Sequence, residues 1–460
     1  MLLRNLKTTI FLSGCVIGFS VLLALPDAHG VPSFARQTGM SCTMCHTVFP
    51  ELTPFGRSFK LTGYTMSKST KPYEFPPPLA GLLQLSFTHL DKDLPRGSIE
   101  DNWATHVRST DNNVLSLPQE ASLYYAGRIY EHLGAFVQGT FDGAEKDIML
   151  DMTDIRYAKT TTLFNKQLLF GLTINNSPTL EDVWNSTPAF GFPSATSSVA
   201  PTPAAAAIVD GMLDQQVGGI GGYGFWNNTL YAGGALYGTA RHGITKILAA
   251  GTSVDTVVEG AAPYWRLVLQ HQWEKQFVSV GTFGMVADIY PEGEVSGPTD
   301  RFTDIAFDAQ YQYVGKKHFL SGHALWIHED QDWDASFSLG NTGKRSGHLD
   351  TFRTHGHYYY RTSFGDLGGS IGYFFTTGNK DTVLYAPDPV GGSRRGKPDS
   401  NGFIFELEYQ KLEITKFLSL KASLQYTLYD KFNGAHSNYD GFGRDASDNN
   451  TLYFLLWFMF

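Results

Sequence analysis

Cysteine and charge are scarce in this chain, and both scarcities narrow what it can be. Three cysteines in 460 residues exclude a fold held together by several disulfides. Only 17% of the residues are charged and the formal net charge is -9, a balance that argues against a nucleic-acid partner. After Gly30 no apolar run is long enough for a transmembrane helix. The chain has instead 14% aromatic residues and 48 glycines, which fit either a large soluble β-protein or a membrane β-barrel.

Residues 1–30 have the features of an export signal. Two basic residues precede an apolar run from Ile10 to Leu25, and Ala28-His29-Gly30 follows as a small-x-small cleavage site. That order is typical of a secretory signal peptide, so we expect the mature chain to begin at Val31. Leu12 to Cys15 resembles a lipoprotein cleavage box, but the apolar run continues past it.

One pentapeptide near the start of the mature chain carries recognisable chemistry. Residues 42–46 read CTMCH, an uninterrupted C-x-x-C-H. This spacing attaches a c-type haem, because two thiols add across the vinyl groups of one porphyrin and the adjacent histidine ligates the iron. The alternatives are a redox disulfide or half of a zinc site, yet the only other cysteine, Cys15, precedes the cleavage site. The sequence therefore predicts one covalently bound haem, held by Cys42 and Cys45, with His46 as an axial ligand of the iron.

Alternating apolar and polar residues predict strands with two unlike faces. Residues 418–428, 403–410 and 304–312 all follow this pattern. One face of such a strand suits lipid and the other water, although a soluble sandwich would give the same alternation. The last ten residues, TLYFLLWFMF, place large apolar side chains on one face and end on an aromatic residue, as terminal strands of outer-membrane barrels do.

The pattern predicts about sixteen strands. They lie near residues 80–90, 119–130, 134–143, 149–160, 163–174, 215–226, 228–239, 261–272, 275–288, 302–314, 317–328, 348–362, 366–377, 401–412, 415–429 and 449–460. The links after odd strands are mostly long and those after even strands are mostly short, as in outer-membrane barrels with extracellular loops and periplasmic turns. We therefore expect an all-β fold over residues 78–460: a transmembrane antiparallel β-barrel in the bacterial outer membrane, surrounded by lipid, with both chain ends periplasmic.

The residues around the haem motif also resemble a known family. Phe34-Ala35-Arg36-Gln37-Thr38-Gly39 precedes the motif, and Phe49-Pro50-Glu51-Leu52 and Pro54-Phe55-Gly56-Arg57 follow it. This block is similar to the haem end of the outer-membrane fused cytochrome–porins of iron-oxidising bacteria, in which a single c-type haem precedes a transmembrane barrel. Over the rest of the chain the resemblance is architectural only. It implies an oxidoreductase that takes electrons from extracellular Fe(II) and passes them to a periplasmic c-type cytochrome or copper protein.

The predicted cytochrome segment is small for its task. Residues 31–77 number 47, too few to bury a haem in a core of their own. A sixteen-stranded barrel leaves an aqueous interior that is wide enough to hold a plug. We therefore expect the segment to plug the lumen from the periplasmic side, where the barrel would enclose the haem.

Other candidate residues are less tightly specified. Met66 is the first choice for a second axial ligand, because a methionine would raise the reduction potential. Met40 and a lumen histidine such as His355 are alternatives, whereas Met44 is poorly placed between the two cysteines. Arg57 is a candidate partner for a haem propionate.

Electron transfer of this kind needs no general base or covalent intermediate, so the sequence predicts no catalytic side chain. A second class of function fits the same features: a solute-selective porin whose haem-bearing segment is a plug or a redox sensor. Liposome swelling separates the two, because a plugged electron conduit should pass little solute.

Overall fold

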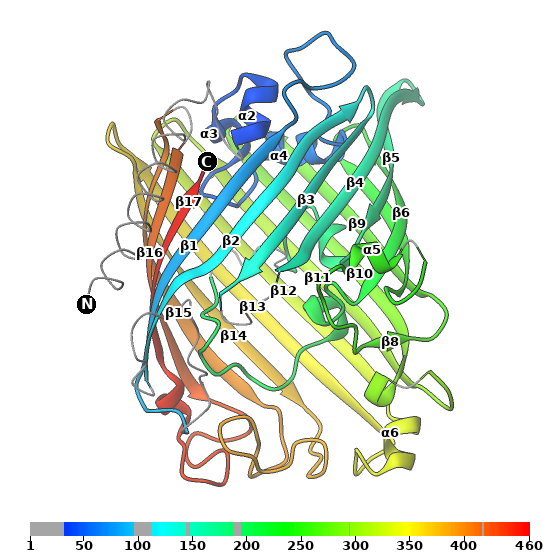
Figure 1. The fold of residues 1–460 in the computed structure, drawn as a ribbon, viewed down its shortest axis with the longest axis vertical. Coiled ribbons are helices and arrows are strands. Elements are labelled where there is room, and N and C mark those ends of the chain that lie inside the picture. Colours follow the sequence, from blue (N-terminus) through cyan, green and yellow to red (C-terminus); the bar gives the residue numbers. More distant parts are fainter. Residues whose placement is uncertain are drawn as a thin grey trace, which may run out of the picture.

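A computed structural model describes residues 32–95, 112–143, 148–187, 195–243, 245–293, 295–415 and 418–460. The predicted signal peptide lies outside these residues. Sixteen long antiparallel strands form a closed barrel, in which the first strand, β1, pairs with both β2 and the last strand, β17 (Figure 1). One further strand, β8, is only two residues long and pairs with β10. The prediction of an antiparallel barrel with sixteen strands is confirmed.

The strands are β1 (Leu79–Leu90), β2 (Asn113–Tyr130), β3 (Leu133–Asp142), β4 (Ile148–Leu163), β5 (Lys166–Asn175), β6 (Val217–Trp226), β7 (Leu230–Thr239), β8 (Val257–Val258), β9 (Ala262–Trp273), β10 (Gln276–Tyr290), β11 (Asp300–Val314), β12 (His318–Asp332), β13 (Ser346–Arg361), β14 (Asp366–Gly378), β15 (Ser400–Thr415), β16 (Leu418–Lys431) and β17 (Thr451–Met459). Short helices are α2 (Pro32–Thr38), α3 (Cys42–Cys45), α4 (Pro54–Leu61), η1 (Pro178–Leu180), η2 (Ile208–Met212), α5 (Thr245–Leu248), η3 (Pro291–Gly293), α6 (Asp334–Leu339) and η4 (Ala446–Asn449). Among the described residues, no helix is long and apolar enough to cross a membrane.

The two ends of the barrel differ in their connections. At one end, which we call the turn end, strands are joined by short turns. Between β4 and β5 the turn is Phe164-Asn165, and both residues have positive φ, as a two-residue hairpin with a type I′ turn requires. The opposite, loop end carries the long connections. Both the N-terminal helices and the C-terminus lie at the turn end (Figure 1), where the Phe460 N–H donates to the Gly81 carbonyl at 3.0 Å.

The barrel wall has an apolar outside and a polar inside. On β11 the outward-facing Ile305 and Phe307 are 44% and 52% exposed, whereas the inward-facing Asp304 and Gln312 are 1% and 0% exposed. The same contrast recurs on β9 and β15, whose outward aliphatic and aromatic side chains are exposed. The predicted two-faced strands are therefore present, and their polar side chains face a filled lumen.

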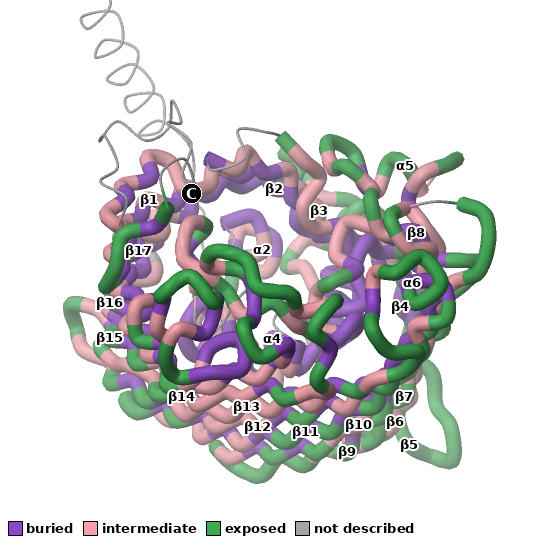
Figure 2. Tube along the Cα trace, turned by 90° about the horizontal axis from the view of Figure 1, so that it is seen from below, coloured by how far each residue is buried: buried purple, intermediate pink, exposed green. Residues whose placement is uncertain are grey.

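Two chain segments fill that lumen. The first is the N-terminal segment, residues 32–77, whose Phe49, Phe59 and Tyr64 pack in one apolar cluster with Tyr124 and Phe136 of the wall. Seen along the barrel, α2 and α4 lie within the outline of the strand ring (Figure 2). β1 begins at Leu79, next to the predicted boundary between this segment and the barrel.

The second is the β5–β6 connection, which we call the inner loop; its described residues are 176–187 and 195–216. It folds inward from the loop end instead of extending into solvent. The backbone N–H groups of Ile208 and Val209 donate to Glu329 at 2.7 Å and to Asp304 at 2.8 Å, which fixes η2 against the inner wall. The lumen is therefore occupied from both ends.

Candidate functional site

The C-x-x-C-H motif is folded as one helical turn followed by an extended residue. Positions three apart in a helix lie on the same face, so α3 directs Cys42 and Cys45 to one side. His46 leaves the helix with φ -125° and ψ 138°, and its backbone N–H donates to the Cys42 carbonyl at 2.9 Å. The motif thus presents two thiols and an imidazole from a compact bend.

The imidazole of His46 is oriented by the chain that follows it. Its Nδ1 lies 3.1 Å from the Pro50 carbonyl oxygen, which can only accept, so Nδ1 carries the proton and Nε2 keeps its lone pair. Burial lowers the pKa of His46 to about 4, against the opposing effect of the backbone carbonyls of Pro50 and Glu51. A neutral imidazole whose Nδ1–H is held by a carbonyl is the usual state of a metal-ligating histidine.

The thiol of Cys45 does not resemble a redox-active cysteine. Burial raises the pKa of Cys45 to about 11, whereas redox-active C-x-x-C pairs have a lowered thiol pKa. Among the described residues, no group of three or more His, Cys, Asp or Glu side chains is arranged to hold a metal ion. The raised pKa of Cys45 is opposite in direction to that of a redox-active thiol.

Helix α4 packs directly against the motif. Thr53 caps the helix by accepting the Gly56 N–H at 3.1 Å, and Pro54 occupies its first turn. The Thr53 N–H also donates to the Cys45 carbonyl at 2.8 Å. A Cβ at position 56 would lie 2.3 Å from that carbonyl oxygen, so only glycine permits this close approach.

A cavity opens beside the motif and holds about 1310 Å³ of empty space, part of it continuous with solvent. Three parts of the chain enclose it: the N-terminal segment, the barrel wall and the inner loop. Its lining includes Cys42, Cys45, His46, Phe49, Leu52, Arg57, Phe59, Tyr64, Tyr124, Phe136, Trp184, His323, His355, Trp457 and Met459. Most of these side chains are aromatic or aliphatic, as in cofactor sites, where a few polar groups fix orientation.

Two N–H groups at this cavity have no protein partner. Arg57 Nε and Trp457 Nε1 are buried without a hydrogen bond among the described residues, and both residues line the cavity. The remaining guanidinium nitrogens of Arg57 donate to Gln312 Oε1 at 2.9 Å and to the Leu52 carbonyl at 2.8 Å. The cavity therefore offers unsatisfied donors to an anionic oxygen.

Glu51 fastens this segment to the barrel wall. Its carboxylate lies 2.9 Å from His323 Nε2 and 2.7 Å from His357 Nε2, and it accepts from Ser321 at 2.6 Å and Gln312 at 2.9 Å. Burial alone would raise the pKa of Glu51, but the charges and hydrogen bonds of His357 and His323 hold it well below its usual range. An ionised carboxylate with four wall partners makes a strong polar clamp.

The structure brings together some predicted residues and separates others. Cys42, Cys45, His46 and Arg57 line one cavity, with His355 and Met40 also at its edge. Met66 is not among the lining residues; it packs against the apolar cluster formed by Phe59, Tyr64 and their neighbours. The assignment of Met66 as a ligand stays a prediction without support from its position.

Several residues at the site were not predicted from the sequence. Glu51 lies within the motif-flanking block, but nothing in the sequence indicates that two wall histidines bind it. Trp457 and Met459 belong to the terminal strand, and a strand pattern alone does not reveal which inward side chain reaches a cavity. Only the pairing of these strands into a closed ring places them beside Cys42.

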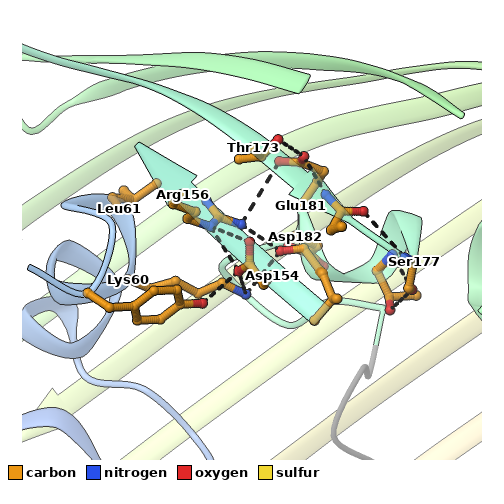
Figure 3. A network of polar contacts seen from close by, with 12 residues as sticks. Lys60, Leu61, Asp154, Arg156, Thr173, Ser177, Glu181 and Asp182 are labelled. Atoms are coloured by element: carbon orange, nitrogen blue, oxygen red, sulfur yellow. Dashed lines mark hydrogen bonds and ion pairs between the residues drawn. The ribbon is translucent and has the colours of Figure 1, made fainter. Parts of the chain in front are cut away.

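On the other side of α4, a polar network joins the N-terminal segment to the wall and the inner loop (Figure 3). Asp154 lies 2.8 Å from Arg156 Nε and accepts from the Tyr64 hydroxyl at 2.6 Å. Lys60 Nζ donates to the Leu180 carbonyl at 3.0 Å and lies 3.6 Å from Asp154. Since Leu180 belongs to the inner loop, Lys60 connects the two segments that fill the lumen.

The inner loop has its own anchor on the wall. Arg266 of β9 is fully buried and lies 3.0 Å from Asp182 and 2.5 Å from Asp308. Trp184, two residues beyond Asp182, lines the cavity and packs under the Arg266 guanidinium, which lies 5.2 Å from its ring. The loop thus closes the cavity on the side facing the loop end.

No protein-family model and no curated protein sequence matches this chain. Solved structures with a similar shape include OmpT of Vibrio cholerae, at 10% identity over 83% of this chain and 96% of that one, with a TM-score of 0.42. An anion-selective porin from Comamonas acidovorans has 11% identity over 83% of this chain and 98% of that one, with a TM-score of 0.44. The outer-membrane channel DcaP of Acinetobacter baumannii has 10% identity over 83% of this chain and 96% of that one, with a TM-score of 0.43. Similarity at this level is too low to carry functional argument, and the barrel's architecture rests on the strand pairing described above.

Proposed function

We propose that this protein is an outer-membrane monohaem cytochrome that oxidises extracellular Fe(II) and passes each electron to a soluble periplasmic carrier. A single observation carries the proposal: the C-x-x-C-H motif faces a largely apolar cavity inside the barrel, where the wall supplies the shelter that 47 residues lack. The identity of the electron donor rests on the resemblance of the flanking residues to fused cytochrome–porins. The apolar outer surface of a closed barrel supports the outer-membrane location.

The residues at the cavity fit a covalently attached haem. Cys42 and Cys45 would form the thioethers, and His46 would ligate the iron through Nε2, the nitrogen left with its lone pair by the Pro50 contact. The unsatisfied N–H groups of Arg57 and Trp457 would suit propionate oxygens. When bound, the haem supplies a one-electron redox couple.

Residues around the cavity would set the reduction potential of that haem. Phe49, Phe59 and Trp457 line the cavity with apolar surface, and burial of a haem against such surface is one way in which a protein sets its potential. The exposed residues Gly39 to Ser41, at the turn end, lead directly into α3. They would give a periplasmic acceptor access to the chain beside the motif.

A second candidate function, a solute-selective porin with a haem-bearing plug, is favoured by the closed barrel with a polar inner wall. The two inward-folded segments weigh against free solute passage. In liposome swelling, an electron conduit should admit sugars and amino acids no faster than protein-free vesicles, whereas a porin should admit them readily.

Stopped-flow mixing of the purified holoprotein with Fe(II), monitored in the haem α-band, tests the proposed activity. We expect reduction within seconds, and no signal from a Cys42→Ala/Cys45→Ala variant that cannot retain haem. A haem-loaded protein that Fe(II) leaves oxidised under anaerobic conditions would refute the proposal.

A further inference from the structure

Two exposed apolar side chains lie at the C-x-x-C-H motif. Met40 precedes the motif and Met44 lies between its two cysteines, and these side chains are 38% and 47% exposed. Met44 is not among the described residues that line the cavity, so its exposed surface faces out of the barrel at the turn end (Figure 1). Isolated exposed methionines need no explanation, but these two lie within one helical turn of the residues proposed to hold the haem.

Two exposed lysines accompany the methionines. The Lys68 N–H donates to the Gln37 carbonyl at 3.0 Å, which holds residue 68 against the end of α2. A Cβ at Gly39 would lie 3.2 Å from Lys68 Cδ and 3.9 Å from Lys68 Nζ, so the side chain of Lys68 crosses the chain just before Met40. Lys71 follows three residues later, and both lysine side chains are exposed.

No exposed carboxylate of the N-terminal segment offsets these charges. Residues 32–77 contain two acidic residues, Glu51 and Glu74. Glu51 is 5% exposed and is bound by the wall histidines. Glu74 lies 2.5 Å from Arg128 Nη2 and accepts from the Ser67 hydroxyl at 2.6 Å. The segment therefore presents a positive surface at the turn end, although the whole chain has a net charge of -9.

The residues Gly39 to Ser41, Met44, Lys68 and Lys71 form a surface that we call the mouth patch. We propose that the mouth patch docks an acidic soluble redox protein, which is reduced by one electron as the haem is oxidised. This inference rests on the proposed function and specifies the chemistry of the acceptor: carboxylates around an apolar area beside its own redox centre. Such interfaces combine an apolar centre with a polar rim, and opposite charges steer the two proteins together.

Anionic lipid headgroups are another ligand for a positive surface, and the position of the patch disfavours them. Helices α2 and α4, which precede and follow the motif, lie within the outline of the strand ring (Figure 2). Cys42 borders a small cavity together with Trp457 and Met459 of β17. The motif end of the patch therefore lies over the barrel opening, whereas lipid surrounds the outside of the wall. A soluble protein reaches that opening from the periplasm.

The test measures binding as well as electron transfer, and it uses the full-length holoprotein in a neutral detergent. Plastocyanin, an acidic copper protein, is the probe. Isothermal titration calorimetry should show binding in low salt, with an affinity that falls steeply as salt is added. The reason is that the Debye length shrinks from about 30 Å at 0.01 M to about 8 Å at 0.15 M ionic strength. Stopped-flow mixing then gives the second-order rate at which oxidised plastocyanin oxidises the reduced holoprotein.

Charge reversal locates the binding surface. Lys68→Glu/Lys71→Glu should weaken plastocyanin binding and slow electron transfer, each by about tenfold or more in low salt, and the difference should vanish in high salt. The matched control is Lys166→Glu/Lys275→Glu, the same charge change in the β4–β5 and β9–β10 turns, which lie elsewhere around the ring. This control should stay within about twofold of wild type. Haem content and protease resistance of the N-terminal segment show whether the reversed variant is folded.

Absence of plastocyanin binding by the wild type in low salt would overturn the inference. Equal losses in the two double variants would also overturn it, because net charge alone would then govern binding. If Lys68→Glu/Lys71→Glu loses bound phosphatidylglycerol in native mass spectrometry but keeps its affinity for plastocyanin, the patch is a lipid site and the inference is wrong. Haem that Fe(II) leaves oxidised, with plastocyanin binding still dependent on the patch, would overturn the proposed function alone. Should the reversed variant misfold, Lys68→Gln/Lys71→Gln gives the same comparison with a smaller expected loss.

Discussion

The N-terminal segment and the inner loop both fill the lumen, but they are held there in different ways. The N-terminal segment brings its own chemistry: a motif, a capped helix and a carboxylate, Glu51, that wall side chains bind. The inner loop contributes acidic residues that form ion pairs with buried cations of the wall, as Asp182 does with Arg266. The N-terminal segment carries the motif of the proposed haem site, and the inner loop closes the space around it.

The residues of the proposed haem motif and the residues that enclose the cavity are therefore specified by the sequence in different ways. The motif would be recognisable on any scaffold, because its residues are contiguous. The enclosure depends on contacts between positions far apart in sequence, such as the one between Lys60 and the Leu180 carbonyl. Variants that release one segment while leaving the other in place can therefore divide the function into its parts.

The largest effect is expected from Arg266→Ala, which should release the inner loop. Removing this buried guanidinium leaves Asp182 and Asp308 without their cation, a loss of about 3–5 kcal/mol. We expect faster proteolysis of the inner loop and measurable solute entry in liposome swelling, with the covalent haem retained. Arg301→Ala is the matched control, because Arg301 is 57% exposed and lies 3.8 Å from Asp288, a pair worth less than about 1 kcal/mol. Equal behaviour of the two variants would contradict the assigned anchor.

The next effect concerns the contact between the two segments and depends on pH. Burial lowers the pKa of Lys60 from its usual 10.5 to about 8, although Asp154 partly opposes this. Between these two values the undocked segment binds more protons than the docked one, so docking should strengthen as pH rises, by up to about tenfold per pH unit. Protease cleavage of the N-terminal segment, measured from pH 7.5 to 10.5, should slow accordingly.

Lys60→Met should abolish that slope, because the position no longer titrates. Lys68→Met provides the matched control: Lys68 is exposed in the same segment, and its replacement should leave the slope unchanged. Parallel pH profiles for wild type and Lys60→Met would show that another group controls docking.

The contrast between the segments also explains what the sequence could reveal. The sixteen strands were predictable from alternating apolar and polar residues together with the connection lengths, and all but the start of β2 lie near their expected bounds. The beginning of β2 at Asn113, instead of near residue 119, was missed because Pro118 within the strand reads as a loop residue. The motif residues Cys42, Cys45 and His46 were predictable from spacing alone.

The walls of the cavity could not be predicted in the same way. Alternation identifies the inward face of β13. It does not show at which level of the lumen His355 lies, or that His355 lines the same cavity as the N-terminal segment. The sequence also does not indicate that the inner loop folds into the lumen. Its inward fold depends on Asp182, Asp210 and their arginine partners, which pair only after the barrel has closed.

A smaller effect is expected from Gly56→Ala, which should displace α4 from the C-x-x-C-H motif while the lumen stays filled. The added Cβ would lie 2.3 Å from the Cys45 carbonyl oxygen, so α4 must move away from the motif, at a cost of about 1–3 kcal/mol. We expect less haem attached per protein, measured as pyridine haemochrome, with liposome permeability unchanged. Ser58→Ala, in the same helix, should attach a normal amount. A full haem content in Gly56→Ala would mean that the motif tolerates displacement of α4.

The smallest effect is expected from Glu51→Gln, which keeps the shape of the clamp and removes its charge. One oxygen can still accept a hydrogen bond, so the loss should be about 1 kcal/mol, the difference between charge-assisted and neutral hydrogen bonds. The N-terminal segment should be cleaved several-fold faster than in wild type, while the inner loop keeps its protection. A double-mutant cycle with His357→Gln isolates the contact. A coupling energy near zero would mean that Glu51 is held by the remaining wall groups and that the segment docks through α4 instead.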